Sequence, residues 1–221
     1  MKVNNFNSRE ELQNEVISLI KTELQRTEDC KHAIMLSGGS TPLVIYNLIA
    51  EHPFDIDKNA IITYSDERYV AIDSPENNYF NTLPMLQALK MGPGNVINVK
   101  TKNGLEEAAN AFHNDLKELL NEGSIPLGFL GMGTDGHTAS LFSLKNVAEG
   151  EGRWSIPVEK ESPPHRISVS KDLLNKVGRL IFILTGEEKK EKLDVLLNNP
   201  EAIPAGLATI DHPNCEVFYC A

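Results

Sequence analysis

Residues Leu127 to Phe142 read L-G-F-L-G-M-G-T-D-G-H-T-A-S-L-F. The first part is apolar and predicts a buried strand, and the second part is a glycine-rich loop that carries Asp135 and His137. Open α/β sheets place their ligands at loops of this kind, beyond the carboxyl ends of the strands. The stretch therefore predicts an α/β protein with a ligand site at this loop, and His137 is the first candidate for a catalytic residue.

The composition limits the class of protein. The chain has 221 residues, of which 41% are hydrophobic, and its formal net charge is −10. Such a charge argues against a general nucleic-acid or membrane-surface binder, although a few cations in a cleft can still hold a small anion. The three cysteines, Cys30, Cys215 and Cys220, lack metal-ligand spacing and predict free thiols in a reducing compartment. No apolar run approaches the roughly 18 residues of a transmembrane helix, and the polar N-terminus is unlike a signal peptide, so a cytoplasmic protein is expected.

Strand and helix patterns alternate along the whole chain. Strands are expected at residues 2–6, 32–36, 60–64, 96–99, 127–130, 154–158, 167–169, 180–184 and 216–219. Helical patterns lie between most of them, the clearest at residues 105–120, and residues 200–206 are expected to form a loop. This alternation predicts an α/β sandwich around a mostly parallel sheet. Because there is no repeat or linker, residues 1–221 are expected to form a single domain.

A second glycine-rich turn follows the strand predicted at residues 32–36. It contains Gly38, Gly39, Ser40 and Thr41, with Thr41 as the expected N-cap of a helix whose first residue is Pro42. Glycines let the backbone approach a ligand, and a helix N-terminus attracts anions. The turn therefore predicts a phosphate site, with a tight strand-to-helix turn that holds no ligand as the alternative.

Five motifs resemble those of the 6-phosphogluconolactonase family. They are L-S-G-G-S-T-P at residues 36–42, S-D-E-R at 65–68 with N-N-Y at 77–79, G-M-G-T-D-G-H-T-A-S-L-F at 131–142, S-P-P-H-R-I-S-V-S at 162–170 and T-G-E-E-K-K at 185–190. They follow the family's order over nearly the whole chain. Two departures affect the expected rim of the site: Ser143 replaces a usual proline, and Ser162 precedes the double proline where a lysine is common.

The resemblance implies a Rossmann-like three-layer sandwich, shared with glucosamine-6-phosphate deaminase and ribose-5-phosphate isomerase. It also implies hydrolysis of 6-phospho-D-glucono-1,5-lactone to 6-phosphogluconate in the oxidative pentose phosphate pathway, without a metal or cofactor. The expected partner is this small sugar phosphate lactone, with no nucleic acid and no membrane. The chain is expected to be a monomer or a small homo-oligomer.

Ester hydrolysis needs an activated water, a stabilised oxyanion and a proton for the leaving oxygen. His137 is expected to act as the general acid/base, because histidine titrates near neutral pH. Asp135 either fixes the His137 tautomer or binds N–H groups of its own loop. The oxyanion is expected at backbone N–H groups near Gly38 and Gly39 or near Gly133.

Arginine and lysine side chains are the expected phosphate ligands. Arg68 and Arg166 are the leading candidates, because a guanidinium group can bind phosphate in a bidentate manner. At most one of Lys189 and Lys190 is expected to reach the site, with Lys189 preferred. Ser40 and Thr41 add hydroxyl donors. Asp66 is expected to contact a sugar hydroxyl, whereas Glu67 and Asn78 are expected to have structural roles.

Two other functions fit parts of this pattern. The first is a sugar-phosphate isomerase or deaminase, a family in which a glutamate stands five residues after the histidine and the charged motif reads D-E-Y. Here those positions hold Phe142 and D-E-R, which favours the lactonase. The second is a non-catalytic sugar-phosphate sensor, which would keep the cations but would not need His137.

Overall fold

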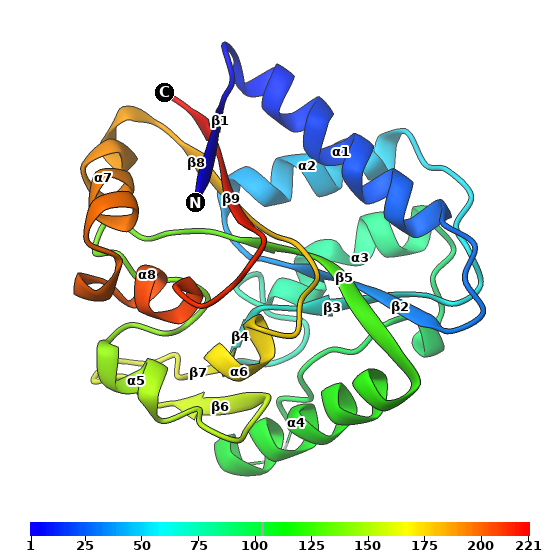
Figure 1. The fold of residues 1–221 in the computed structure, drawn as a ribbon. Helices are drawn as coiled ribbons and strands as arrows, with labels where there is room; N and C mark the ends of the chain where they lie inside the picture. Colours follow the sequence, from blue (N-terminus) through cyan, green and yellow to red (C-terminus); the bar gives the residue numbers. More distant parts are fainter. Residues whose placement is uncertain (103) are drawn as a thin grey trace.

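Six of the predicted strands form one parallel sheet at the centre of the computed structural model, which describes residues 1–102 and 104–221 (Figure 1). The strands in spatial order are β1 (Lys2–Asn5), β9 (Cys215–Cys220), β8 (Leu180–Thr185), β5 (Gly123–Leu130), β2 (Lys31–Leu36) and β3 (Ala60–Tyr64). Neighbours in the sheet are parallel throughout. The prediction of a mostly parallel sheet is therefore confirmed.

Helices cover both faces of this sheet. One face packs against α1 (Arg9–Gln25), α2 (Ser40–Glu51) and α3 (Asn78–Ala88), which bury apolar side chains such as Val16, Ile45 and Met85. The other face packs against α4 (Leu105–Glu122), α5 (Leu144–Ala148), α6 (Lys171–Leu174), α7 (Lys190–Asn198) and α8 (Pro204–Thr209). In the longer helices, such as α1 and α4, the buried apolar residues recur about every three or four positions, so each of these helices has one buried side. The three layers of the expected sandwich are thus present.

A second, smaller sheet lies among the helices of the second face. It is antiparallel and contains β4 (Asp66–Arg68), β7 (Arg166–Val169) and β6 (Ser155–Val158) in that spatial order. The sequence predicted the two later strands, but it left residues 66–68 as a charged segment after β3. Their pairing with β7 places Arg68 directly opposite Arg166.

Three local predictions are wrong. Residues 96–99 form no strand beyond a single bridge from Val96 to Ile62. Residues 200–206 are not a loop, because they form a 3₁₀ turn at Pro200–Ala202 and the start of α8. Proline begins both elements, and its fixed φ suits a helix start. Finally, α2 begins at Ser40 after a Gly39 cap, so Thr41 is not its N-cap.

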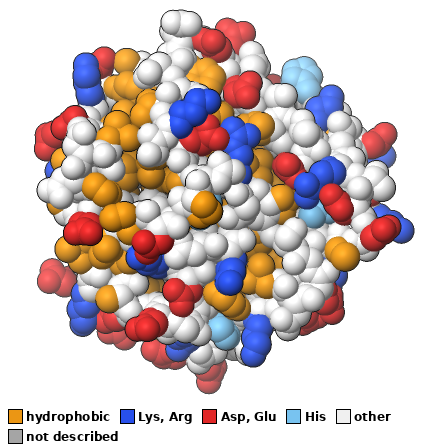
Figure 2. All heavy atoms as spheres, in the orientation of Figure 1, with side chains coloured by type: hydrophobic (Ala, Val, Ile, Leu, Met, Phe, Trp, Pro, Cys, Tyr) orange, Lys and Arg blue, Asp and Glu red, His pale blue; other side chains and the backbone are white. Residues whose placement is uncertain are grey.

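The outer surface carries charges of both signs. Figure 2 shows acidic and basic side chains interspersed with apolar ones over the face seen in Figure 1. Within residues 1–102 and 104–221, no helix combines the length and the apolar character that crossing a membrane requires.

Candidate active site

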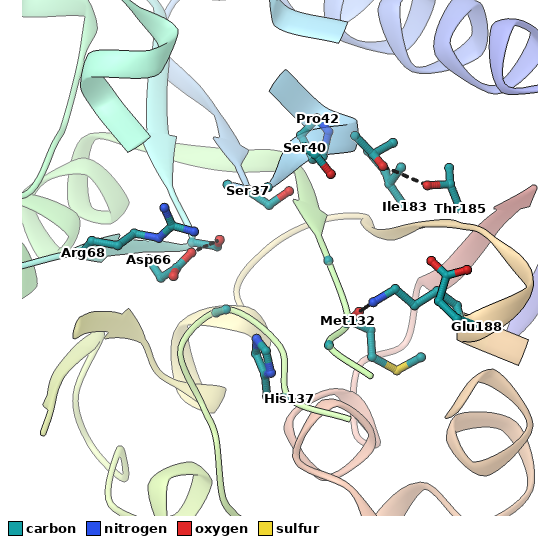
Figure 3. Close-up of a pocket in the computed structure, with 18 of the residues that line it drawn as sticks. Ser37, Ser40, Pro42, Asp66, Arg68, Met132, His137, Ile183, Thr185 and Glu188 are labelled. Atoms are coloured by element: carbon teal, nitrogen blue, oxygen red, sulfur yellow. Dashed lines mark hydrogen bonds between the residues drawn. The ribbon is translucent and has the colours of Figure 1, made fainter. Parts of the chain in front are cut away.

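A pocket of about 420 Å³ opens at the carboxyl ends of the central strands (Figure 3). Its walls come from the loops after β2, β3, β5 and β8. In the sheet, β5 lies beside β2. The chain leaves β2 toward α2 on one face of the sheet, and it leaves β5 toward α5 on the other face. The loops after them diverge and leave a crevice, which is the usual ligand position in open α/β sheets. Most of the predicted site residues line it, namely Gly38, Gly39, Ser40, Thr41, Asp66, Arg68, His137 and Lys189.

The loop after β2 is shaped by its two glycines. Gly39 has a φ of 111°, a left-handed conformation that favours glycine, and this turn lets helical geometry begin at Ser40. Gly38 is packed so closely that an added Cβ would lie 2.3 Å from Asn78 Oδ1. Thr41 Oγ1 shares a 2.8 Å hydrogen bond with Thr185 Oγ1 of β8. The N-terminus of α2 is therefore held at the pocket wall, where its partial positive charge suits an anion.

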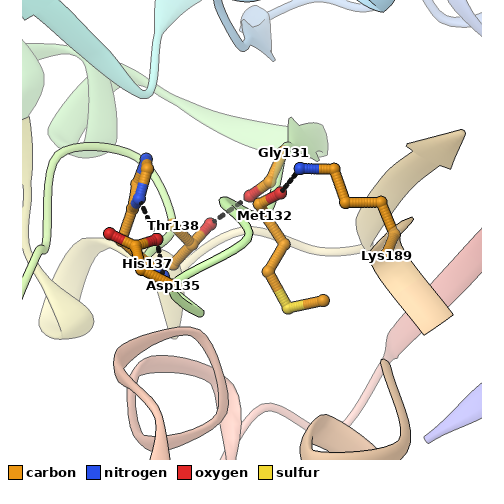
Figure 4. A network of polar contacts seen from close by, with 6 residues as sticks. All are labelled: Gly131, Met132, Asp135, His137, Thr138 and Lys189. Atoms are coloured by element: carbon orange, nitrogen blue, oxygen red, sulfur yellow. Dashed lines mark hydrogen bonds and ion pairs between the residues drawn. The ribbon is translucent and has the colours of Figure 1, made fainter. Parts of the chain in front are cut away.

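His137 and Asp135 form a pair in the loop after β5 (Figure 4). His137 Nδ1 lies 2.6 Å from Asp135 Oδ1, and the same oxygen accepts the His137 backbone N–H at 3.2 Å. Partial burial alone would raise the pKa of Asp135, but the hydrogen bonds from His137 outweigh it and lower that pKa below its ordinary value. An ionised carboxylate only accepts, so Nδ1 carries the proton and Nε2 is left as the basic nitrogen. Asp135 thus makes both of the contacts considered for it, one to the His137 ring and one to a backbone N–H of its own loop.

The absence of a side chain at Gly133 leaves space for the His137 ring and the Asp135 carboxylate. An added Cβ at Gly133 would lie 2.2 Å from His137 Nδ1 and 2.4 Å from Asp135 Oδ1. The Gly133 N–H also donates to the His137 carbonyl at 2.9 Å. This N–H is therefore already used inside the loop and is not itself free to bind an oxyanion.

Substitution of Gly133 by alanine should lower kcat/KM about 100-fold, because the new methyl group must displace the His137 ring or the Asp135 carboxylate. Steady-state kinetics with the substrate proposed below would measure the loss. Gly94→Ala is the matched control, because an added Cβ there meets no atom within 4 Å. Equal activity of the two variants would show that the pair can move without loss of function.

Asp66 connects β4 to the loop after β5 through hydrogen bonds of its carboxylate. The residue is 8% exposed, and its carboxylate accepts hydrogen bonds from Ser140 Oγ at 2.6 Å and from Ser65 Oγ at 3.1 Å. Ser140 belongs to the same loop as His137, and its backbone N–H donates to Ser168 Oγ at 3.1 Å. The carboxylate therefore faces the pocket while it ties β4 to the loop after β5.

Arg68 and Arg166 form a cross-strand pair of cations. Arg68 lines the pocket, and its guanidinium donates to the Glu76 carbonyl at 2.8 Å. Arg166 lies outside the pocket lining, where its guanidinium donates to the carbonyl oxygens of Pro164 and His165. Burial and the neighbouring Arg68 lower the pKa of Arg166 below its ordinary value. Like charges opposite each other are unfavourable in a sheet, and an anion beside them would relieve the repulsion.

Lys189 and Lys190 point to different surroundings. Lys189 Nζ donates to the Met132 carbonyl at 2.8 Å and lines the pocket (Figure 4). Lys190 Nζ is 3.7 Å from the Glu187 carboxylate on the surface. In Figure 3, Met132 lies on the opposite side of the pocket from Arg68. The cations are thus distributed around the cavity rather than gathered at one point.

The pocket also contains residues that the sequence did not suggest. Arg9 at the start of α1 and Glu188 beside Lys189 both line it. Phe142 contacts the site from behind, with its ring centroid 4.7 Å from that of His137. Glu188 lies within the T-G-E-E-K-K motif, which could have identified it, but Arg9 lies far from every motif in the sequence. In the part of the chain that the structure describes, no three His, Cys, Asp or Glu side chains gather in a way that could hold a metal ion.

Comparison with known proteins gives consistent results. The sequence model of the family described as glucosamine-6-phosphate isomerases/6-phosphogluconolactonase matches residues 7–217. A 6-phosphogluconolactonase of Haemophilus influenzae is 31% identical over 186 residues, which cover 82% of this chain and 80% of the relative. The crystal structure of a 6-phosphogluconolactonase from Shewanella baltica superposes with a TM-score of 0.87 at 25% identity, over 100% of this chain and 98% of the other.

A monomeric glucosamine-6-phosphate deaminase has the same fold. Its structure superposes with a TM-score of 0.81 at 18% identity, over 100% of this chain and 97% of the other. At that identity the likeness concerns the fold alone. It confirms the expectation that the fold is shared with glucosamine-6-phosphate deaminase.

Proposed function

Because the chain belongs to the family of glucosamine-6-phosphate isomerases and 6-phosphogluconolactonases, we propose that it hydrolyses 6-phospho-D-glucono-1,5-lactone to 6-phosphogluconate. The observation that carries the proposal is the pairing of His137 with Asp135 at 2.6 Å, at the wall of a pocket that also contains Arg68 and Lys189. A basic nitrogen and anion-binding groups in one cavity are what a phosphorylated ester requires. We place the reaction in the oxidative pentose phosphate pathway of the cytoplasm.

The proposed reaction begins with a water molecule between His137 Nε2 and the lactone carbonyl carbon. Nε2 takes a proton from this water as its oxygen attacks the carbon, and backbone N–H groups at the pocket wall stabilise the resulting oxyanion. When the tetrahedral intermediate collapses, the bond from the carbonyl carbon to the ring oxygen breaks. The imidazolium then returns its proton to the ring oxygen, which leaves as a hydroxyl group.

Asp135 supports both halves of this proton transfer. It keeps the His137 proton on Nδ1 before the reaction, and its charge stabilises the imidazolium that forms afterwards. Phe142 packs against the same ring at 4.7 Å, so a ring rather than a carboxylate occupies the position where deaminases carry a glutamate. This arrangement suits a single histidine that takes and returns one proton.

The phosphate is proposed to bind at the N-terminus of α2 together with the surrounding cations. Ser40, Thr41, Arg68 and Lys189 all line the pocket beside this helix. Arg166 lies opposite Arg68 on β7. We propose that its guanidinium gives up the hydrogen bonds to the Pro164 and His165 carbonyl oxygens and binds the phosphate instead. Asp66, fixed by two serine hydroxyls, is proposed to accept a hydrogen bond from a sugar hydroxyl.

The activity is tested by adding freshly prepared 6-phosphogluconolactone to the purified protein and following acid release in a pH-stat. Spontaneous hydrolysis, measured without protein, is subtracted. A clear excess rate that is proportional to protein concentration is expected. If the protein gives no excess rate but still binds 6-phosphogluconate, the non-catalytic sensor is the better description.

Substitution of Asp135 by asparagine should lower kcat about tenfold, because the amide oxygen can still accept from Nδ1 but the charge that stabilises the imidazolium is lost. The reduction is smaller than for a buried acid, since the Asp135 side chain is 62% exposed and solvent screens its charge. Asp135→Ala, which also loses the acceptor, should lower kcat further. Steady-state kinetics of both variants test this order, and equal rates for the two would contradict it.

A further inference from the structure

Glu67 is a fully buried carboxylate that the proposed reaction does not use. Its side chain is 0% exposed, although it lies between the pocket residues Asp66 and Arg68. Oε1 accepts the backbone N–H groups of Asn78 at 2.7 Å and Arg68 at 2.8 Å, and Oε2 accepts that of Tyr79 at 3.0 Å. A buried charge is costly to maintain even when it is hydrogen-bonded. Local packing alone does not explain why a carboxylate is buried at this position.

Capping of α3 does not by itself explain the buried carboxylate of Glu67. Asn77 already caps this helix by accepting the Phe80 N–H at 2.9 Å, as an ordinary N-cap residue does. Glu67 adds two further bonds to the first turn of the helix and a third to the backbone of Arg68. One carboxylate thus fixes the start of α3 relative to β4.

Asn78 carries this restraint on to the anion-binding loop. Its backbone is held by Glu67, and its side chain Nδ2 donates to the Asp66 carbonyl at 2.9 Å. The same side chain lies against Gly38, where a Cβ would be 2.3 Å from Asn78 Oδ1. Any shift at the start of α3 would therefore move both the loop before α2 and the strand that carries Arg68.

We propose that Glu67, in its ionised form, is a positioning residue that holds Arg68 and the Gly38 loop at the spacing that the substrate's phosphate requires. The inference rests on the proposed function and adds to it a residue that never touches the substrate. It predicts that Glu67 affects binding of the phosphorylated substrate rather than the reaction at the lactone carbonyl.

The ionisation of Glu67 falls within the range where enzymes are assayed. Burial raises the pKa of Glu67 to about 7, against the opposing effect of its three backbone hydrogen bonds. The charged and titratable groups around it are Asp66 and Arg68 on its own strand, Arg166 on β7 and Tyr64 at the end of β3. Above this pH the carboxylate can accept all three N–H groups, and below it one oxygen carries a proton.

The test is the substitution Glu67→Gln. The amide oxygen can replace Oε1, but the amide nitrogen then faces the Tyr79 N–H, so two donors oppose each other. KM for 6-phosphogluconolactone should rise about tenfold with kcat nearly unchanged, which is the signature of lost ground-state binding. Glu151→Gln is the matched control, because Glu151 is exposed and does not line the pocket.

The pH dependence separates an ionised positioning residue from a merely structural one. The KM ratio of Glu67→Gln to wild type should be largest at about pH 8 and approach about one near pH 6, where the wild-type carboxylate is itself protonated. Protonation of the substrate phosphate affects both proteins alike and cancels in this ratio. A ratio that is the same at both pH values overturns the requirement for ionisation.

A second variant covers the case in which Glu67→Gln does not fold, as judged by circular dichroism. Asn78→Ala keeps the backbone bonds to Glu67 but removes the side chain at Gly38, so it should raise KM by a factor that does not depend on pH. An unchanged or lower KM in the folded variants would overturn the proposal. If the wild type shows no lactonase activity, the proposed function fails instead, and sulfate binding by calorimetry compares the same variants without a reaction.

Discussion

Replacement of His137 by alanine is expected to reduce kcat by about 100-fold to 10,000-fold, the range that a general acid/base contributes. Nε2 is the basic nitrogen of the Asp135 pair at the pocket wall, and alanine leaves water and the ring oxygen without a proton carrier. KM should change little, because the phosphate is held by other residues. The pH-stat assay, with spontaneous hydrolysis subtracted at each substrate concentration, measures both constants.

The control for this variant is His52→Ala, which removes an exposed histidine at the end of α2. It should retain wild-type kinetics. If His137→Ala also retains them, the proton carrier must be another group of the pocket, and Asp66 would be the next to test because its carboxylate faces the same cavity. The proposed mechanism would then be wrong even if the lactonase activity is real.

Replacement of Arg68 by alanine should raise KM for 6-phosphogluconolactone about tenfold to 100-fold, the effect of losing one charge-assisted contact to phosphate. The fall in kcat should be much smaller. D-Glucono-1,5-lactone, which lacks the phosphate, supplies the internal control, because its weak hydrolysis should be the same in wild type and variant. An equal loss with both lactones would place Arg68 at the sugar ring or the carbonyl.

Arg166→Ala belongs to the same experiment and should change KM in the same direction. The expected effect is smaller than for Arg68, because Arg166 lies outside the pocket lining and donates to backbone carbonyls. A loss of kcat without a change in KM would place Arg166 near the reacting carbonyl instead. Comparison of the changes in KM and kcat in the two variants therefore shows which arginine lies closer to the phosphate and which lies closer to the lactone carbonyl.

The parallel sheet could be predicted because its strands are short apolar runs followed by glycine turns, as at residues 127–133 and 32–39. The second sheet could not. Residues 66–68 are Asp-Glu-Arg, which have low strand propensity, and they become a strand only because β7 lies beside them. The pairing of Arg68 with Arg166 therefore depends on tertiary contacts that no local pattern reveals.

The site was predictable wherever a motif occupies one loop. The spacing of Asp135 and His137 fits their contact, and Gly133 shows why the loop needs glycine there. Arg9 was missed because its place in the pocket follows from the packing of α1 against the sheet, and nothing near it in the sequence suggests a ligand. The role proposed for Glu67 likewise depends on three backbone N–H groups that only the folded chain brings to its carboxylate.

The pairing of the edge strand β1 with its neighbour β9 bears on the order in which the chain folds. Among the residues that the structure describes, residues 2–5 pair with residues 216–219 alone, as Lys2 opposite Glu216 and Asn5 opposite Tyr219 show. Closing so long a loop is slow, because its entropic cost precedes any stabilising contact. During synthesis β1 leaves the ribosome before β9 and stays unpaired until β9 has emerged. Of the strands in this sheet, β1 is thus translated before the others but is among the latest to pair.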